Sequence, residues 1–294
     1  MTDHPSTPGS NPHHRLRNRI AHLTAAIAIV AAAAVAPASA AEPAPCPNAG
    51  TSAFLQGELP RFSARLAQGR TLKIVAIGSS STAGAGATSA SNSYPSQLES
   101  DLSRRYPGHD IDVINVGVNG QEVPDMLARL DRDVLEHTPD LVIWQFGSNG
   151  LMRGRPLAEM EAAARSGIER LKQAGSEVML MDLQHAPRID GAPGRDDVLR
   201  MMERLSESTG AALFHRYRMM KAWAASLGSA YTQMLAADQL HMTDASYRCM
   251  ADTLAAGLQG AVNRGIAAAR RNTGNWATAA IRFPLQPARA ASAP

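Results

Sequence analysis

Hydrophobic and polar positions along residues 72–263 alternate between short apolar runs and longer amphipathic stretches. The apolar runs are rich in Val, Ile and Leu, which predicts buried strands. The stretches between them place apolar residues three and four positions apart, which predicts helices with one buried face. We expect strands at residues 72–77, 111–116, 141–146, 177–183 and 211–214, and helices at residues 94–106, 123–136, 157–174, 195–208 and 243–263.

This alternation predicts an α/β domain in which five strands form a mostly parallel sheet covered by helices on both faces. The near-continuous apolar character of the strands agrees with it, because the strands of such a sheet are buried on two sides. Thr243 is placed to cap the last helix, with Asp244 in its first turn. The sequence contains no internal repeat, so we expect one domain with loose ends.

Composition and charge narrow the choice of function. The chain has 294 residues, of which 45% are hydrophobic and 19% are charged, and this supports a folded core. The formal net charge is +3, but Arg15, Arg17 and Arg19 supply most of the excess. The rest of the chain is close to neutral. Nucleic-acid binding needs a clustered basic face, so we expect no nucleic-acid partner.

The first forty residues have the three regions of a secretory signal. The three arginines precede an alanine-rich apolar run at residues 20–35, and residues 38–40 (Ala-Ser-Ala) supply the small residues of a cleavage site. We therefore predict export to the periplasm or the exterior, with no stable membrane anchor after cleavage. An uncleaved anchor is the alternative, because the run is close to the ~17 residues that a membrane-spanning helix needs.

Two cysteines, Cys46 and Cys249, lie beyond the predicted signal. An oxidising compartment permits a disulfide between them, which would tie the start of the mature chain to the last helix. Two free thiols are the alternative. We divide the chain into a signal peptide (1–40), an N-terminal arm (41–65), the folded domain (66–268) and a flexible tail (269–294).

Candidate chemistry gathers where the predicted strands end, which is where open parallel sheets bind their ligands. Residues 78–84, 115–120 and 147–150 are rich in Gly, Ser and Asn, and residues 238–241 read Asp-Gln-Leu-His. Each segment alone is consistent with an ordinary turn or helix cap. A phosphate-binding loop is disfavoured, because residues 78–84 lack a P-loop lysine and the dinucleotide-binding spacing.

Taken together, these segments resemble the conserved blocks of the SGNH hydrolase (GDSL esterase/lipase) superfamily. The first block, Gly-Asp-Ser-x-x-x-Gly, is matched by residues 78–84, and its nucleophile position falls on Ser80. The second-block glycine and the third-block asparagine match Gly117 and Asn149. In the family these two residues and the nucleophile's own N–H form the oxyanion hole. The last block, Asp-x-x-His, is matched intact by Asp238 and His241.

The resemblance covers roughly residues 72–258 and implies a three-layer α/β/α sandwich with the flavodoxin-like SGNH hydrolase fold. Two positions depart from the family pattern. Ser79 and Gly150 stand where the family usually has aspartates. Neither position is the nucleophile, the base or an oxyanion donor in the family, so the machinery is complete. The departures indicate a divergent exported subgroup with its own substrate.

The residue types also fit this chemistry on their own. A serine hydroxyl needs an adjacent base, and the imidazole of His241 can take and return a proton near neutral pH. Asp238 can orient that imidazole, while the N–H groups of Ser80 and Gly117 and the Asn149 amide can stabilise an oxyanion. We therefore expect an exported serine carboxylic-ester hydrolase that forms an acyl-Ser80 intermediate.

The substrate class stays open between a carbohydrate O-acetyl ester and a short-chain ester, so the partner is a small-molecule or polysaccharide ester. An O-acyltransferase with the same triad and an inactive carbohydrate-binding protein are the alternatives. His185, after the fourth predicted strand, either lines the pocket or is structural. No Cys, His and carboxylate group has metal-ligand spacing, so we expect no metal and no cofactor. We expect a monomer.

Overall fold

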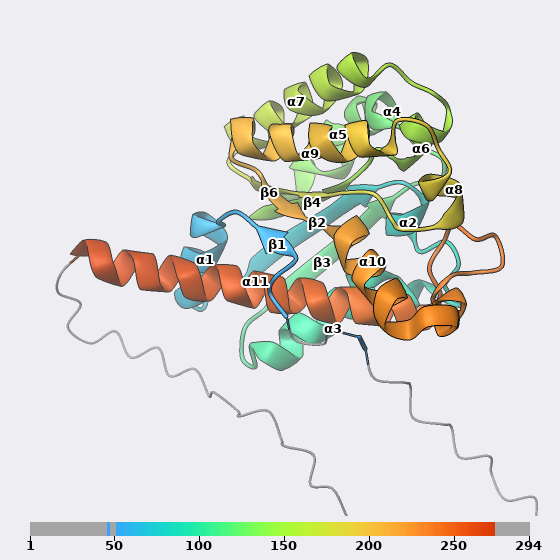
Figure 1. The fold of residues 1–294 in the computed structure, drawn as a ribbon. Coiled ribbons are helices and arrows are strands. Elements are labelled where there is room, and N and C mark those ends of the chain that lie inside the picture. Colours follow the sequence, from blue (N-terminus) through green and yellow to red (C-terminus); the bar gives the residue numbers. More distant parts are fainter. Residues whose placement is uncertain (1–45, 48–50, 274–294) are drawn as a thin grey trace, which may run out of the picture. The chain divides into compact units, whose positions relative to one another are not determined.

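A single sheet organises the chain in the computed structural model, which describes residues 46–47 and 51–273 (Figure 1). The predicted signal peptide and most of the predicted tail lie outside the described residues. Within these residues the sheet has six strands in the order β1-β6-β5-β4-β2-β3. They are β1 (Leu55–Gln56), β2 (Leu72–Gly78), β3 (Ile111–Gly117), β4 (Leu141–Gln145), β5 (Glu177–Met181) and β6 (Ala212–Phe214).

The prediction of a mostly parallel sheet is confirmed, since β2 to β6 run parallel. Their order β3-β2-β4-β5-β6 is that of flavodoxin-like folds, in which the chain changes direction across the sheet between β2 and β4. The apolar runs predicted five strands and did not reveal β1, which pairs antiparallel with β6. A strand of two residues has no periodicity that a sequence pattern could show.

Helices cover both faces of the sheet, which gives the three expected layers (Figure 1). One face is covered by α4 (Val123–Ala128), α5 (Leu130–Asp133), α7 (Leu157–Gln173) and α9 (Arg195–Thr209). The other is covered by α1 (Pro60–Ala67), α3 (Tyr94–Arg105), α10 (Arg216–Leu227) and α11 (Asp244–Thr273). Among the described helices, none combines the length and apolar character that crossing a membrane requires.

The two faces of the sheet pack into two separate hydrophobic cores. In β2, Ile74 and Ala76 belong to the core beneath α3 and α11, whereas Val75 and Ile77 belong to the core beneath α4 and α7. All four side chains are fully buried. Successive side chains of a strand point to opposite faces. This explains why the strand sequences are apolar throughout, and each large buried side chain contributes about 1.5–3 kcal/mol.

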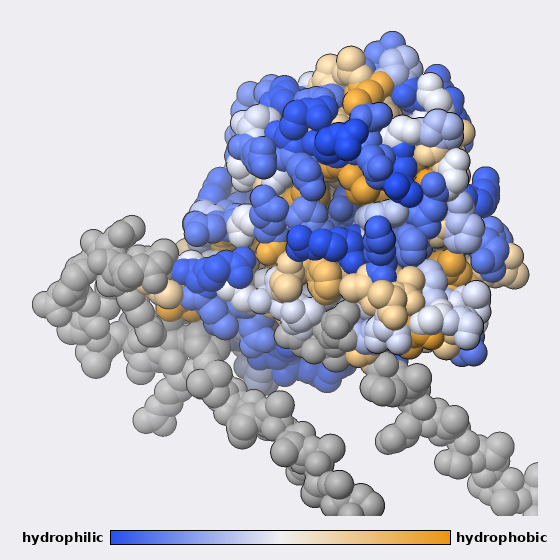
Figure 2. Space-filling view, in the orientation of Figure 1, coloured by the Kyte–Doolittle hydropathy of each residue, from blue (hydrophilic) through white to orange (hydrophobic). Residues whose placement is uncertain are grey.

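Short helices occupy the loops between the layers. Of these, α2, α6 and α8 directly follow β2, β4 and β5, so they lie at the carboxyl edge of the sheet. The full set is α2 (Ser80–Ala83), η1 (Ala90–Asn92), η2 (Leu135–His137), α6 (Ser148–Met152), α8 (Pro187–Asp190) and η3 (Gly228–Met234). On the face seen in Figure 2, hydrophilic side chains predominate, with hydrophobic patches among them.

The predicted helix at residues 123–136 is instead broken into α4, α5 and η2. The first break falls at Arg129, whose backbone leaves the helical conformation (φ −116°, ψ 8°). Its side chain is buried, where Nε donates to Gln121 Oε1 (2.7 Å) and Nη1 to Asp133 Oδ2 (3.0 Å). These polar contacts accompany the break, and the apolar spacing of the segment does not encode them.

The ends of the domain also differ from the expected boundaries. α1 spans the predicted boundary at residues 65 and 66, so the second half of the predicted arm is part of the fold. α11 runs past Asn263 and past the predicted start of the tail at residue 269, and ends at Thr273. The division of the chain into four parts otherwise stays a prediction.

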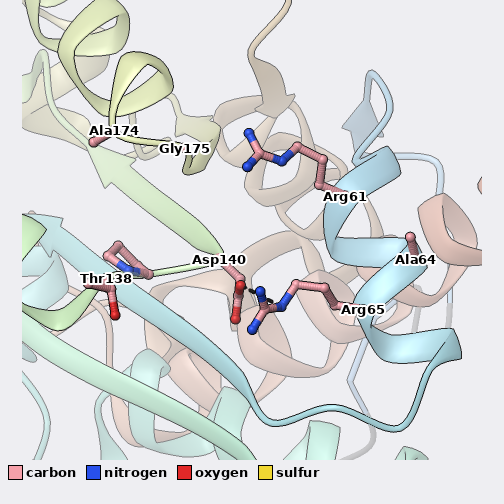
Figure 3. Close-up of a pocket in the computed structure, with 8 residues that line it drawn as sticks. Arg61, Ala64, Arg65, Thr138, Asp140, Ala174 and Gly175 are labelled. Carbon is pink, nitrogen blue, oxygen red and sulfur yellow. Dashed lines mark ion pairs between the residues drawn. The ribbon is translucent and has the colours of Figure 1, made fainter.

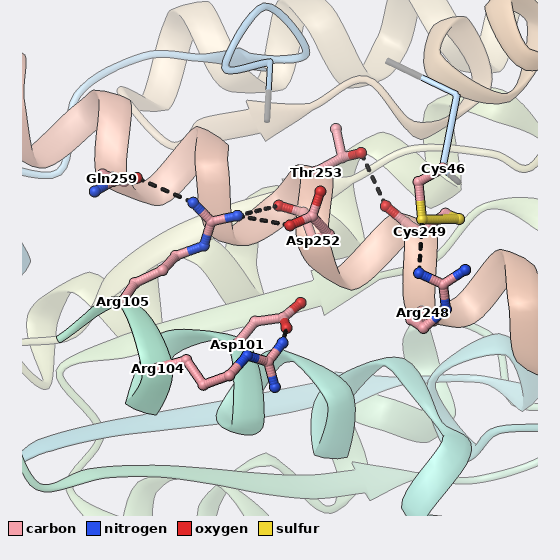
Figure 4. A network of polar contacts seen from close by, with 9 residues as sticks. All are labelled: Cys46, Asp101, Arg104, Arg105, Arg248, Cys249, Asp252, Thr253 and Gln259. Atoms are coloured by element: carbon pink, nitrogen blue, oxygen red, sulfur yellow. Dashed lines mark hydrogen bonds and ion pairs between the residues drawn. A yellow bond between two sulfur atoms is a disulfide. The ribbon is translucent and has the colours of Figure 1, made fainter. Parts of the chain in front are cut away.

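The structure contains the disulfide that the sequence permits, between Cys46 and Cys249 in α11 (Figure 4). Arg248 Nη1 donates to Cys46 Sγ (3.1 Å) beside it. Further along α11, Arg105 of α3 forms an ion pair with Asp252 (2.6 Å). The last helix is thus fastened covalently to the start of the described chain and electrostatically to α3.

Candidate active site

Ser80 is the first residue of α2, immediately after β2 and at the switch point between β2 and β4. The turn before it is anchored to β4, because Gln145 Oε1 accepts from the Ser79 N–H (3.0 Å), the Ser79 hydroxyl (3.1 Å) and the Thr82 hydroxyl (3.2 Å). A β carbon at Gly78 would lie 2.2 Å from Thr82 Oγ1, so only glycine fits there. The strand end, the turn and the buried glutamine therefore fix the position of Ser80.

His241 lies in a tight turn between η3 and α11. An isolated antiparallel bridge pairs Leu235 with Met242 and closes this turn. Within it, the Ala236 N–H donates to the His241 carbonyl (2.8 Å), and Gln239 takes up a left-handed conformation with φ 56°. The turn thus brings the His241 and Asp238 side chains into contact.

The structure brings Ser80, His241 and Asp238 together in one chain of contacts. His241 Nε2 lies 2.7 Å from Ser80 Oγ, and His241 Nδ1 lies 2.5 Å from Asp238 Oδ2. The second carboxylate oxygen, Asp238 Oδ1, accepts from the N–H groups of Leu240 and His241, each at 3.0 Å. This is the geometry in which an imidazole can take a proton from a serine hydroxyl while a carboxylate orients it.

The Asp238 side chain is 44% exposed at the surface of the turn. Burial raises the pKa of its carboxyl. The hydrogen bonds from the His241 N–H, the His241 imidazole and the Leu240 N–H outweigh this, and the pKa is lowered overall. A charged carboxylate beside Nδ1 favours the tautomer with its proton on Nδ1. That tautomer leaves a lone pair on Nε2 facing Ser80.

The predicted oxyanion donors differ in how the structure places them. Asn149 is in the first turn of α6 after β4, and its Nδ2 donates one hydrogen to the Gln121 carbonyl (2.9 Å), which leaves the second available. The Ser80 N–H is at the start of α2, where a helix leaves its amides without intrahelical partners. The Gly117 N–H, in contrast, donates to Asn115 Oδ1 (2.9 Å) and is already satisfied.

Gly117 serves the packing of the site. A β carbon there would lie 2.2 Å from the Ala83 nitrogen, so the glycine allows β3 to approach α2 closely. Gly120 is a donor candidate that the sequence pattern did not single out. Its N–H has no acceptor in the part of the chain that the structure describes, and it adjoins Gln121, the partner of Asn149. The available signal was a second glycine after the same strand, at a position with φ +77°.

The two departures from the family pattern have structural explanations. Ser79 is buried and donates to Gln145, whose Oε1 is an acceptor, and an aspartate there would place a carboxylate against that oxygen. At Gly150, a β carbon would lie 2.3 Å from Met160 Sδ, so any larger residue would require the Met160 side chain to shift. Both positions are therefore matched to neighbours particular to this chain.

Two cavities are prominent in the described residues, and only one is near this site. A cavity of about 210 Å³ is lined by Gly147 and Gly150, which flank Asn149, and by Glu122 and Met160. The other, of about 440 Å³, lies at the amino ends of β4 and β5 between Arg61, Arg65 and Asp140 (Figure 3). It is at the edge of the sheet opposite Ser80, where this fold class does not bind its substrates.

Three other histidines lie outside the contact between Ser80, His241 and Asp238. His215 is buried, with Nε2 3.0 Å from Gln56 Oε1, and it fastens β1 to β6. His109 Nε2 lies 3.0 Å from the Leu66 carbonyl, also away from Ser80. His185 lies at the carboxyl edge, after β5. Among the described residues, no group of His, Cys, Asp and Glu is arranged to hold a metal ion.

Comparisons with known proteins place this geometry in context. The chain matches the model of the Non-GDSL lipase-like family over residues 45–264. It is 34% identical to an arylesterase of Vibrio mimicus over 95 residues, which are 32% of this chain and 46% of that protein. It is 27% identical to an acetylxylan esterase of Geobacillus stearothermophilus over 159 residues, 50% of this chain and 71% of that protein. The match therefore spans less than half of the arylesterase.

The fold is also similar to solved structures. A two-domain esterase active on acetylated mannans superposes with a TM-score of 0.61 at 19% identity, covering 71% of this chain and 55% of that one. A catalytic mutant of an acetylxylan esterase from Geobacillus stearothermophilus gives a TM-score of 0.54 at 24% identity. The superposition covers 63% of this chain and 93% of that one. At these identities the likeness concerns the fold.

Proposed function

The chain belongs to the Non-GDSL lipase-like family, within the SGNH hydrolase superfamily, and we propose that it is an exported serine carboxylic-ester hydrolase. The observation that carries the proposal is the continuous contact from Ser80 Oγ through the His241 imidazole to the Asp238 carboxylate. These residues come from two segments 161 residues apart in the sequence. A structural role for either segment alone would not require a hydroxyl, an imidazole and a carboxylate in line.

In the proposed reaction, Ser80 Oγ attacks the ester carbonyl carbon while its proton passes to His241 Nε2. The tetrahedral intermediate then expels the alcohol, whose oxygen takes the proton from Nε2, and an acyl-Ser80 ester remains. Water attacks this ester by the same route and releases the carboxylic acid. Asp238 stabilises the imidazolium that forms in each half of the reaction.

The negative oxygen of the tetrahedral intermediate needs preorganised donors. We assign the Ser80 N–H and Asn149 Nδ2 to this role, as the sequence suggested. The Gly120 N–H takes the third place in our proposal, because the Gly117 N–H already donates to Asn115. Removing one such donor typically lowers the rate roughly 10²–10³-fold.

Export is the second part of the proposal. It rests on the signal-like sequence of residues 1–40 and agrees with the disulfide between Cys46 and Cys249, a bond that oxidising compartments favour. The names of the relatives, an arylesterase and an acetylxylan esterase, support a short acyl group on an aryl or carbohydrate alcohol. The proposed substrate is therefore a small-molecule or polysaccharide ester outside the cytoplasm.

The test is hydrolysis of p-nitrophenyl acetate by the purified mature protein and by Ser80→Ala. The variant should lose activity by at least about 10³-fold, because triad members act as a unit. Ser81→Ala is the matched control, since Ser81 is the next residue of α2 and its side chain is buried. It should retain activity. Comparable rates for Ser80→Ala and the wild type would overturn the proposed mechanism.

A further inference from the structure

A second histidine–aspartate pair lies at the carboxyl edge of the sheet, outside the proposed triad. His185 follows β5, and its Nδ1 lies 2.8 Å from Oδ2 of Asp190, the last residue of α8. We propose that His185 forms a subsite that binds a hydroxyl group on the alcohol part of the ester, so that the substrate is the ester of a polyhydroxylated alcohol such as a sugar. This inference rests on the proposed ester hydrolysis and deepens it.

The pair is held rigidly by aromatic rings. The His185 ring packs edge-on against Tyr217, with 5.3 Å between centroids, and tilted against Tyr231, at 5.5 Å. The Tyr231 hydroxyl also donates to the His185 carbonyl (2.6 Å). Ring and backbone are therefore fixed before any ligand arrives, which reduces the entropy lost on binding.

Asp190 is equally constrained. Its Oδ1 accepts from the Tyr217 hydroxyl (2.9 Å), and Arg195 Nη1 lies 3.7 Å from the same oxygen. Burial and then the contact with Asp190 raise the pKa of Tyr217 to about 12, so its hydroxyl remains a donor. A carboxylate held beside Nδ1 favours the His185 tautomer with its proton on Nδ1. Nε2 is then a hydrogen-bond acceptor.

His185 is partly open to solvent. Its side chain is 20% exposed, while Nδ1 is buried and, although it lies 2.8 Å from Asp190 Oδ2, makes no hydrogen bond with the described residues. The exposed part of the side chain therefore does not include Nδ1, and the acceptor Nε2 is left to meet a ligand. A polar atom fixed on a rigid scaffold with one free lone pair is suited to recognise a donor hydroxyl.

The surroundings place this ring between the two halves of the proposed active site. The preceding residue, Gln184, accepts through Oε1 from the hydroxyl of Ser148, the neighbour of Asn149 (2.7 Å). On the other side, Tyr231 belongs to η3, which leads directly into the turn that carries His241. His185 thus lies between the segment that bears the proposed oxyanion donor and the segment that bears the proposed base.

The chemistry of this subsite selects the alcohol and not the acyl group. An aryl or simple alkyl alcohol offers no hydroxyl to Nε2 once it is esterified. A partially acetylated sugar offers several. Because a polar group that loses its partner is costly to desolvate, the subsite also disfavours substrates that would cover Nε2 with an apolar surface.

The experiment compares two esters of the same acid, p-nitrophenyl acetate and partially acetylated xylo-oligosaccharide, for the wild type and His185→Phe. Phenylalanine keeps a ring between the two tyrosines and removes both nitrogens. We expect kcat/KM for the sugar ester to fall roughly tenfold, chiefly through KM, while the value for p-nitrophenyl acetate stays within about twofold. His109→Phe, a histidine away from Ser80, is the control and should leave both values unchanged.

Equal effects of His185→Phe on both esters, or none on either, would overturn the subsite. If this variant does not fold, as judged by its thermal transition, His185→Gln replaces it, and we expect its kcat/KM for the sugar ester to fall by less than tenfold while the value for p-nitrophenyl acetate stays within about twofold. A wild type that hydrolyses the aryl ester but no sugar ester would refute the subsite and leave the proposed function standing. A wild type inactive on both would refute the proposed function itself.

Discussion

Gly86 lies directly against the turn that carries His241. A β carbon built at residue 86 would be 3.0 Å from the β carbon of His241 and 2.5 Å from the carbonyl oxygen of Met242. Gly86 belongs to the loop that continues from α2, and the backbone there has φ +90°. The distance between Ser80 and His241 therefore depends on how closely this loop and the His241 turn approach each other.

We expect Gly86→Ala to displace the His241 turn and to lower kcat/KM for p-nitrophenyl acetate by about 10–100-fold, because a shift of about 1 Å in a catalytic group has effects of this size. Gly108→Ala is the matched control. Gly108 has nearly the same backbone angle, φ +87°, but a β carbon there would meet nothing within 4 Å. Both variants should lose some stability from backbone strain. Equal activities of the two variants would show that the Gly86 contact does not position His241.

Asp238→Asn should preserve the fold and impair turnover. Asparagine can still accept from the N–H groups of Leu240 and His241, but it no longer favours the proton on His241 Nδ1 or stabilises the imidazolium. We expect kcat to fall about 10²–10⁴-fold, with KM changed much less. Steady-state kinetics and a thermal transition measured on the same sample separate the two effects. Wild-type kcat in a folded Asp238→Asn protein would remove Asp238 from the mechanism.

The carboxyl of Asp133 should make the stability of the fold depend on pH in the acidic range. The hydrogen bond from Arg132, then that from Arg129, lowers the pKa of its carboxyl to about 2 in the folded protein. A group with a lowered pKa stabilises the fold above its ordinary pKa, and this contribution is lost as the pH falls through the lowered value. Asp133→Asn should therefore lower the melting temperature at pH 7 by about 1–3 °C, after allowance for screening by solvent.

The difference in melting temperature between the wild type and Asp133→Asn should persist down to about pH 4 and shrink toward pH 2. Differential scanning calorimetry at pH 7, 4 and 2.5 measures it. Asp131→Asn is the control, because Asp131 is 75% exposed in its ion pair with Arg170. A difference that grows as the pH is lowered would contradict the assigned sign.

The Cys46–Cys249 disulfide joins two residues that are 203 positions apart in the sequence and so closes a long loop. Constraint of the unfolded chain predicts that reduction lowers the free energy of unfolding by roughly 2–5 kcal/mol. Urea denaturation with and without dithiothreitol measures this. Cys46→Ser should show the lower stability in both conditions and no further effect of the reductant. Two titratable thiols in the unfolded, unreduced wild type would contradict the bond.

The parallel part of the sheet could be predicted from the sequence because each buried strand is a continuous apolar run. The short β1 could not, since two residues carry no period, nor could the break at Arg129, since its guanidinium contacts Gln121 and Asp133 only in the folded chain. α10 was also missed. Its first residues include the fully buried Arg216, a residue type that sequence patterns assign to the surface.

For the site, the resemblance to the SGNH blocks was enough to select the three residues that the structure brings together, but not to choose the glycine whose N–H is free. The matches of residues 78–84 and 238–241 to the first and last blocks imply that Ser80, Asp238 and His241 lie together, and the structure places them in contact. The choice between Gly117 and Gly120 could not be made from sequence, because both lie at the carboxyl end of the same strand, Gly117 as its last residue and Gly120 in the loop after it. It depends on the Asn115 side chain, whose Oδ1 accepts from the Gly117 N–H and whose Nδ2 donates to the Thr82 carbonyl (2.8 Å).

The central claim is that Ser80 is the nucleophile activated by His241. The most direct measurement is mass spectrometry of the mature protein after reaction with a fluorophosphonate, which bonds covalently to an activated serine. We predict a single adduct on the peptide containing Ser80, located at Ser80 by fragmentation and absent from His241→Gln. An adduct on Ser79 or Ser81, or labelling of Ser80 that is undiminished in His241→Gln, would contradict this claim.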